Sequence, residues 1–196
     1  MTDRFGMAGL GGHTLGPAFS FHLNKGAAAR RATLLIMNSE RISITFGGAN
    51  NAFIMTAEQW LSRPVSEVSS FFADAGNLDA LTPPWLRFEI LTPRPIAMQV
   101  GARIDYRLRI RGLPVRWQSE ISEWNPPYRF VDEQRRGPYR LWHHTHTFVA
   151  RDNGTVVRDS VRYDVPGGAL ANALFVRRDL QKIFAYRQQK LAELFP

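Results

Sequence analysis

The chain of 196 residues is long enough for one domain with a sizeable core, and its 44% hydrophobic and 21% charged residues argue against disorder or a coiled coil. Cysteine is absent, which excludes disulfides, thiolate nucleophiles and cysteine-based zinc or iron–sulfur sites. The formal net charge is +8, but the arginines are scattered along the chain, which indicates a solvated basic face more than a nucleic-acid motif.

Residues 1–50 differ from the rest of the chain. They contain the glycine pairs Gly11–Gly12 and Gly47–Gly48, few aromatic residues and no sustained apolar period. We therefore expect a flexible or poorly ordered segment, in which residues 41–46 have the short amphipathic pattern of a strand. Met37 offers an alternative start of translation.

Two short helices are expected where the periodic part of the chain begins. An apolar stretch, residues 53–61, precedes Ser62, a candidate N-cap, and Pro64, which the first turn of a helix tolerates. We expect this helix to end near Asp74 and a second short helix to stop at Pro83.

A run of strands follows without intervening helices. Apolar and polar residues alternate with period 2, the pattern of strands with one buried and one wet face. Glycine, proline and Asp-Asn-Gly turns separate the stretches, which predicts antiparallel hairpins. The predicted strands cover residues 86–91, 104–110, 115–121, 128–135, 139–150 and 157–165.

The C-terminal part of the chain predicts one long amphipathic helix. Pro166–Gly167–Gly168 ends the sheet, and the remainder up to Phe195 has neither glycine nor proline. The order of elements predicts an α+β fold, in which a curved antiparallel sheet wraps around this helix. The apolar face of the helix contains Leu180, Ile183, Phe184, Leu191 and Leu194.

Four segments together carry a family resemblance. They are Thr82-Pro-Pro-Trp-Leu-Arg-Phe88, Trp117 to Trp124, Asn125-Pro-Pro-Tyr-Arg-Phe-Val-Asp132 and Gly137-Pro-Tyr-Arg-Leu-Trp-His-His-Thr-His-Thr-Phe148. They resemble bacterial members of the START-like, or Bet v 1-like (SRPBCC), superfamily of the polyketide cyclase/dehydrase or coenzyme-Q-binding-protein type. The resemblance implies that residues 51–196 form a helix-grip, ligand-binding domain whose cavity takes lipids, quinones, polyketides or other apolar molecules. Some members are carriers and others enzymes, and the fold does not choose between them.

The segment around His144 and His146 is the strongest candidate for a site. Side chains two apart share a face of a strand, so both histidines face the cavity together with Trp142 and Phe148. Three interpretations are open: zinc ligands with a third ligand from another strand, such as Asp132 or Asp159; a general acid or base; or histidines hydrogen-bonded to waters and cross-strand side chains. We favour the third, and expect no metal and no cofactor.

Further polar and aromatic side chains share the predicted inner face. Asp159 is expected to pair with a histidine or an arginine, because an unpaired buried carboxylate is costly. Asp132 is equally a structural partner or an anchor for a ligand head group. The predicted ligand-binding set is Phe88, Tyr106, Trp117, Phe130, Asp132, Gln134, Trp142, His144, His146, Phe148, Tyr163 and Phe184.

The leading functional hypothesis is the binding, transport or presentation of a hydrophobic small molecule, with the basic surface contacting anionic membranes. One alternative is a cyclase or dehydratase that uses His144 or His146 as acid or base; another is a ribosome- or RNA-associated protein, although we expect no nucleic-acid partner. The longest apolar runs fall far short of the roughly 20 residues of a membrane span, so we expect a cytoplasmic location.

Overall fold

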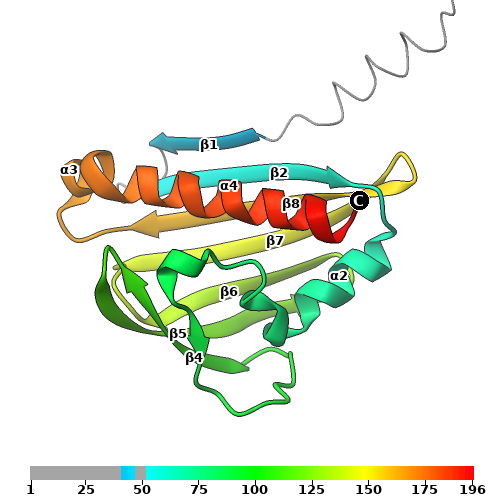
Figure 1. Ribbon diagram of the computed structural model, residues 1–196, viewed down its shortest axis with the longest axis horizontal. Helices are drawn as coiled ribbons and strands as arrows, with labels where there is room; N and C mark the ends of the chain where they lie inside the picture. Colours follow the sequence, from blue (N-terminus) through cyan, green and yellow to red (C-terminus); the bar gives the residue numbers. More distant parts are fainter. Residues whose placement is uncertain (1–40, 47–51) are drawn as a thin grey trace, which may run out of the picture.

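One antiparallel sheet organises the computed structural model, which describes residues 41–46 and 52–196. Its strands are hydrogen-bonded in the order β1-β2-β8-β7-β6-β5-β4-β3 (Figure 1). The strands are β1 (Arg41–Phe46), β2 (Phe53–Leu61), β3 (Glu89–Ile90), β4 (Arg103–Ile110), β5 (Leu113–Asn125), β6 (Arg129–Arg136), β7 (Leu141–Arg151) and β8 (Gly154–Asp164).

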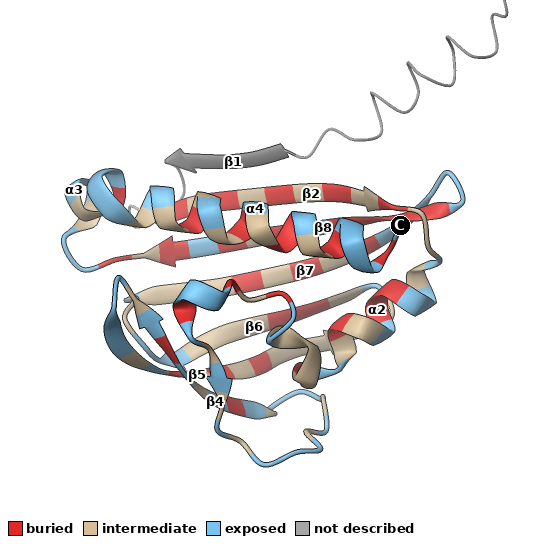
Figure 2. Ribbon diagram, in the orientation of Figure 1, coloured by how far each residue is buried: buried red, intermediate tan, exposed pale blue. Residues whose placement is uncertain are grey.

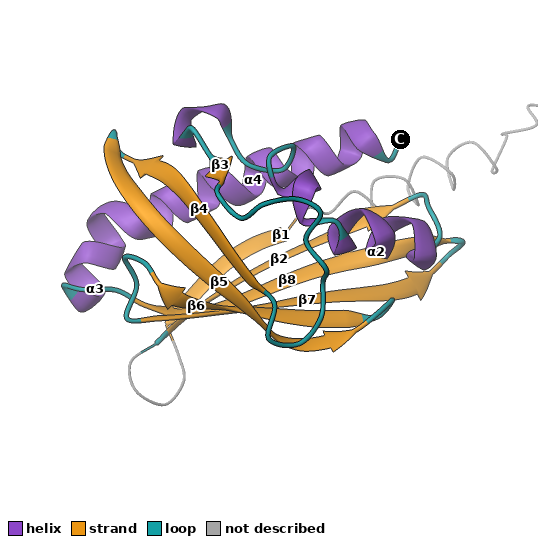
Figure 3. Cartoon of the chain, turned by 90° about the horizontal axis from the view of Figure 1, so that it is seen from below, coloured by secondary structure: helices purple, strands orange, loops and turns teal. Residues whose placement is uncertain are grey.

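A long C-terminal helix crosses the concave side of the sheet (Figures 1 and 3). It is continuous through three parts, of which the middle one, η4, is a π-helical turn. The helical elements are α2 (Val65–Ala73), the short 3-10 turns η2 (Ala75–Leu78) and η3 (Pro84–Leu86), α3 (Gly168–Ala171), η4 (Asn172–Val176) and α4 (Arg177–Leu194). The predicted α+β helix-grip architecture is confirmed.

The core lies between the sheet and the helices (Figure 2). In β2, every second residue from Phe53 to Leu61 is buried, as expected of a strand with one covered face. One apolar cluster joins α2 to the C-terminal end of α4 through Phe72 and Leu191, and a second joins β2 and β8 to the start of α4. The two clusters fix the two ends of the helix against the sheet.

Three local predictions were wrong. Ser62 does not cap α2, which begins after Pro64; the Ser62 hydroxyl donates instead to the backbone carbonyl of Pro196, at 2.6 Å. The predicted strand over residues 86–91 shortens to β3, because Pro84 starts a 3-10 turn that ends in the left-handed backbone of Arg87 (φ 46°).

The third error concerns the apolar face of α4. Leu194 is 45% exposed rather than buried. The buried stripe runs through Leu180, Phe184 and Leu191, and the next position on it, four residues after Leu191, is Phe195, which is buried. Leu194 is therefore turned towards solvent at the end of the helix.

The N-terminal segment is described only in part. Strand β1 pairs with β2, from Arg41 opposite Glu58 to Phe46 opposite Phe53. The rest of the segment that was predicted to be flexible, with Met37, lies outside the described residues. None of the helices in the described part of the chain has the length and apolar character of a membrane span.

Candidate functional site

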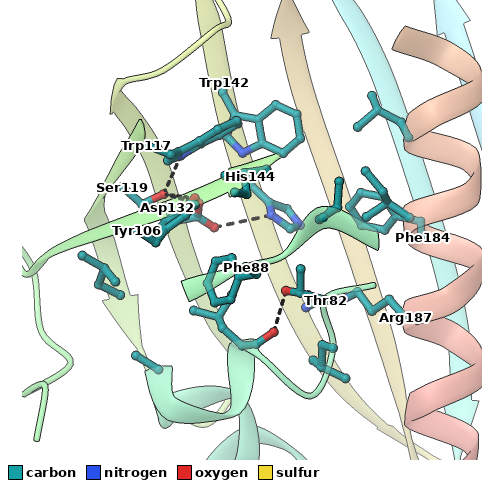
Figure 4. Close-up of a pocket in the computed structure, with 18 of the residues that line it drawn as sticks. Thr82, Phe88, Tyr106, Trp117, Ser119, Asp132, Trp142, His144, Phe184 and Arg187 are labelled. Atoms are coloured by element: carbon teal, nitrogen blue, oxygen red, sulfur yellow. Dashed lines mark hydrogen bonds and ion pairs between the residues drawn. The ribbon is translucent and has the colours of Figure 1, made fainter. Parts of the chain in front are cut away.

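A cavity of about 590 Å³ lies between the sheet and the C-terminal helix. Strands β4 to β7 form one wall, and α4 together with the segment from α2 to η3 forms the other (Figure 4). Nine of the residues predicted from the sequence line it: Phe88, Tyr106, Trp117, Phe130, Asp132, Trp142, His144, His146 and Phe184.

Three predicted residues lie outside the cavity. The Gln134 side chain bonds both backbone groups of Tyr139, its Nε2 donating at 2.7 Å and its Oε1 accepting at 3.2 Å. Phe148 packs against Phe72 of α2, and the buried Tyr163 hydroxyl donates to Asn172 Oδ1 at 2.9 Å. Strand alternation predicted the inner face, but helices cover both ends of that face and leave only its middle hollow.

Aromatic rings make up much of the sheet wall. The Tyr106 ring stacks on Trp117 at 5.9 Å with an interplanar angle of 17°, and Trp117 meets Trp142 edge-on at 5.3 Å. Phe88 adds a tilted ring 5.0 Å from Tyr106. These rigid, flat surfaces suit an apolar ligand with a planar portion.

Polar groups gather in one region of the same wall. Ser119 Oγ accepts a hydrogen bond from Trp117 Nε1 at 3.1 Å, lies 3.1 Å from the Tyr106 hydroxyl, and donates to Asp132 Oδ1 at 3.4 Å. Burial and the nearby Asp132 carboxylate raise the pKa of Tyr106 well above its usual value. Tyr106 therefore keeps its proton and can donate a hydrogen bond.

Two histidines and two carboxylates form the centre of this polar region. His144 Nε2 lies 3.0 Å from Asp159 Oδ1, and His146 Nε2 lies 3.0 Å from Asp132 Oδ2. The other ring nitrogens face the opposite carboxylates: His146 Nδ1 is 2.9 Å from Asp159 Oδ1, and His144 Nδ1 is 3.4 Å from Asp132 Oδ2. The two imidazole rings are thus held between two carboxylate oxygens.

Strand register brings these groups together. Asp132 of β6 stands opposite His144 of β7, and Asp159 of β8 stands opposite His146. Side chains directly opposite on one face are close enough to interact. Phe130, opposite His146, stacks on its ring at 4.1 Å and shields one side of the cluster.

Arg187, like Ser119, lines the cavity but was missed by sequence reasoning. Its Nε lies 3.4 Å from Asp159 Oδ2, and its guanidinium carbon lies 5.0 Å from the centre of the Phe72 ring. A signal was present in the sequence, because position 187 falls on the buried stripe of α4 between Phe184 and Leu191. An arginine at such a position needs a buried anion as its partner.

The charges of the cluster shift the pKa values of its members. Burial raises the pKa of Asp159, but Arg187 and the two histidines outweigh this effect and hold it well below the ordinary value. Burial likewise raises the pKa of Asp132, and the hydrogen bond from His146 together with nearby positive charge lowers it overall. Both carboxylates are therefore ionised.

The two histidines shift in opposite directions. Burial, and repulsion from His146, lower the pKa of His144. Burial also lowers the pKa of His146, but its hydrogen bond with Asp132 and the close approach of the Asp159 carboxylate outweigh this and raise it. The wall of the cavity therefore offers fixed negative charge, two imidazoles and a hydroxyl donor to a bound molecule.

The model of the family described as polyketide cyclase / dehydrase and lipid transport matches residues 61–186. The chain belongs to this family. The predicted START-like, Bet v 1-like membership is thereby confirmed, and the family supports binding of a hydrophobic ligand in general. Coenzyme Q as the ligand remains a prediction. Among curated proteins, none matches the chain significantly.

Solved structures with the same fold come from bacteria and plants. Protein Ms6760 from Mycobacterium smegmatis is 15% identical, with a TM-score of 0.58 over 79% of this chain and 97% of its own. The protein TTHA0849 from Thermus thermophilus is 21% identical, with a TM-score of 0.51 over 71% and 94%. Major latex-like protein 151 from Panax ginseng is 9% identical, with a TM-score of 0.55 over 72% and 96%. At these low identities, the similarity to the three structures establishes only that this chain shares their fold.

The ion pair between Arg187 and Asp159 generates a stability prediction. Arg187→Met keeps the apolar stem but leaves a buried carboxylate without its cation, so we expect the free energy of unfolding in urea to fall by about 3 kcal/mol or more. The control Lys182→Met changes an exposed lysine on the same helix and should stay within about 0.5 kcal/mol of the wild type. In a double-mutant cycle, the loss of stability in the Arg187→Met, Asp159→Asn double variant is compared with the sum of the losses in the two single variants. If the loss equals that sum, the two side chains are not coupled and the prediction is contradicted.

Proposed function

We propose that this protein binds a largely apolar small molecule in the cavity and carries or presents it. The observation that supports the proposal most directly is the unfilled interior of about 590 Å³, lined mainly by aromatic and aliphatic side chains. Its volume falls within the range of roughly 300–1,000 Å³ that is usual for small-molecule sites. Membership of a family that includes lipid transport supports the same proposal.

The arrangement of polar groups supports one orientation of the ligand. Tyr106, Ser119, Asp132 and His144 lie together on the sheet wall, while the helix wall opposite presents Leu180, Ile183 and Phe184 beside Arg187 (Figure 4). A ligand with an apolar body and one oxygen-bearing end would place that end on the sheet wall, because buried polar groups are costly without partners.

The aromatic wall favours some ligand classes over others. Stacked and edge-on rings at Tyr106, Trp117 and Trp142 match a planar ring better than a saturated chain. We therefore favour a quinone or a polyketide-like compound over a simple fatty acyl lipid. The alternatives of a cyclase or dehydratase, and of ribosome or RNA association, remain predictions.

A cavity-filling variant tests the binding proposal. Ile110 lines the cavity at the end of β4 and is only partly buried, so Ile110→Trp adds bulk to the cavity without opening the core. With Nile red as an apolar fluorescent probe, we expect the dissociation constant to rise at least about tenfold relative to the wild type, measured by fluorescence titration.

The matched control is Val149→Trp, which places the same side chain at an exposed position of β7 outside the cavity. This variant should bind Nile red as the wild type does. A wild-type protein that leaves the probe fluorescence unchanged, or an Ile110→Trp variant that binds as tightly as the control, would refute binding in this cavity.

We further propose that the surface beside the end of the cavity at Arg111 docks on an anionic lipid surface. Leu170 of α3, Leu174 and Phe175 of η4, and Leu113 of β5 are all exposed. Arg111, two residues before Leu113, connects the start of β5 to the C-terminal helix. Its guanidinium carbon lies 4.7 Å from the centre of the Phe175 ring, and its Nε lies 2.8 Å from Asp179 Oδ2. We call the four exposed apolar residues the rim patch.

Basic side chains accompany the rim patch. Arg177 and Arg178 are exposed in the turn of α4 that follows η4, and Arg111 and Lys182 both belong to the cavity lining. Apolar side chains that insert into a lipid interface, next to cations that attract anionic head groups, are the combination that binds peripheral proteins to membranes. Docking there would bring the cavity close to the source of an apolar ligand.

Vesicle co-sedimentation tests the docking proposal. We expect the wild type to bind phosphatidylcholine vesicles only when they contain phosphatidylglycerol, and less at high salt, because screening weakens the electrostatic attraction. Leu174→Glu should lose most of the bound fraction. The control Val100→Glu makes the same charge change at an exposed apolar residue outside the patch and should lose much less. Equal losses in the two variants, or equal binding to pure phosphatidylcholine, would reject docking through the rim patch.

A further inference from the structure

The geometry points to a binding site for a divalent transition-metal ion formed by Asp132, His144 and His146. From the sequence, Asp132 and Asp159 were the carboxylates that could supply a third ligand, but no metal was expected. The strand register supplies that ligand, because Asp132 stands directly opposite His144. One ligand atom from each of the three residues lies within 4.8 Å of the other two.

The separations suit an ion placed among the three atoms. His146 Nε2 and His144 Nδ1 lie 3.0 and 3.4 Å from the same oxygen, Asp132 Oδ2. Ligand atoms held tetrahedrally at about 2.0–2.1 Å from one ion lie about 3.4 Å from each other. The two nitrogen–oxygen separations are therefore already close to those of a coordination site, and the two nitrogens lie within 4.8 Å of each other.

The hydrogen-bond inventory of the cluster leaves room for a cation. Four ring nitrogens face carboxylate oxygens, whereas two neutral imidazoles bring only one N–H each. Two neutral imidazoles therefore leave two of the four contacts with a nitrogen lone pair against a carboxylate oxygen, and one imidazole with one imidazolium still leaves one such contact. His146 Nδ1 is buried and makes no hydrogen bond among the described residues, although Asp159 Oδ1 is 2.9 Å away.

A metal ion resolves both problems together. With the ion on His146 Nε2 and His144 Nδ1, the protons move to the other nitrogens, and both of those face Asp159 Oδ1. Metal-bound histidines usually donate their second N–H to a carboxylate, which fixes the tautomer and the ring orientation. Asp159 is in turn held by Arg187. The chain therefore already contains the outer partners that such a site needs.

The site would keep open coordination positions towards the cavity. Asp132 and His144 line the cavity (Figure 4). His146 also lines it, whereas Asp159 does not belong to its lining. Two imidazoles and one carboxylate with open positions suit Zn²⁺ or Fe²⁺. With such an ion, the cluster and Arg187 carry one net positive charge. If the ligand proposal holds, the bound molecule would then offer one anionic oxygen, as an enolate, a phenolate or a carboxylate does.

The experiment uses Co²⁺ as a spectroscopic probe on the full chain, after chelator treatment and without an affinity tag. We expect one Co²⁺ per chain with the visible absorption of a low-coordinate nitrogen and oxygen site, and displacement of Co²⁺ by Zn²⁺. Asp132→Asn and His146→Gln should abolish this spectrum. Asp159→Asn should weaken binding by about 10–100-fold, as outer partners of metal ligands do.

Matched controls lie on the same two strands. Glu133 and His143 are paired across β6 and β7, are half-buried, and do not belong to the cavity lining. Glu133→Gln and His143→Gln should bind Co²⁺ as the wild type does. Circular dichroism reports whether each variant is folded. If a variant of a metal ligand does not fold, the Co²⁺ titration of the wild type still shows whether the protein binds the metal.

The inference is overturned if folded wild-type protein shows no Co²⁺ absorption, because protons alone would then occupy the cluster. It is also overturned if Asp132→Asn binds Co²⁺ as tightly as Glu133→Gln does. Metal binding is measured without an organic ligand. Its failure therefore leaves Nile red binding untouched, and failure of Nile red binding leaves the metal site untouched.

Discussion

The contact between Arg187 of the C-terminal helix and Asp159 of β8 is the interaction on which the inner wall of the cavity depends. It joins the helix to the middle of the sheet, where no solid apolar core fills the space between them. Asp159 in turn holds both imidazole rings, and His146 and His144 hold Asp132. The orientation of the histidines and carboxylates on the cavity wall therefore follows from one buried ion pair.

The sequence was sufficient to predict which face of each strand points inwards, but not which residues of the neighbouring strands lie opposite. Period-2 alternation predicted that His144, His146 and Trp142 point inwards, and they line the cavity. The partner of each histidine depends on register, which is set by turn geometry and by bulges such as the register shift between Gln118 and Ser119 in β5. Alternation within one strand carries no information on these offsets, so the meeting of Asp132 with both histidines had to come from the structure.

The same reasoning explains which of the predicted residues lie outside the cavity. Phe148 and Tyr163 lie on the expected face but at its two ends, where α2 and the start of the C-terminal helix pack against them. Arg187 was overlooked because a long polar side chain on an amphipathic helix usually extends to solvent. Its place on a stripe with Phe184 and Leu191 is the feature that distinguishes it.

Stability alone does not account for a buried cluster of this composition. Replacing buried ionic groups by apolar residues of similar volume is often neutral or stabilising, so an apolar wall would hold the strands as well. The cluster also faces the hollow of the cavity through Asp132, His144 and His146 rather than a packed core. A group of charges that is expensive to bury and is directed at an otherwise apolar cavity supports the proposal that it serves binding, through contact with an oxygen of the ligand or with a cation.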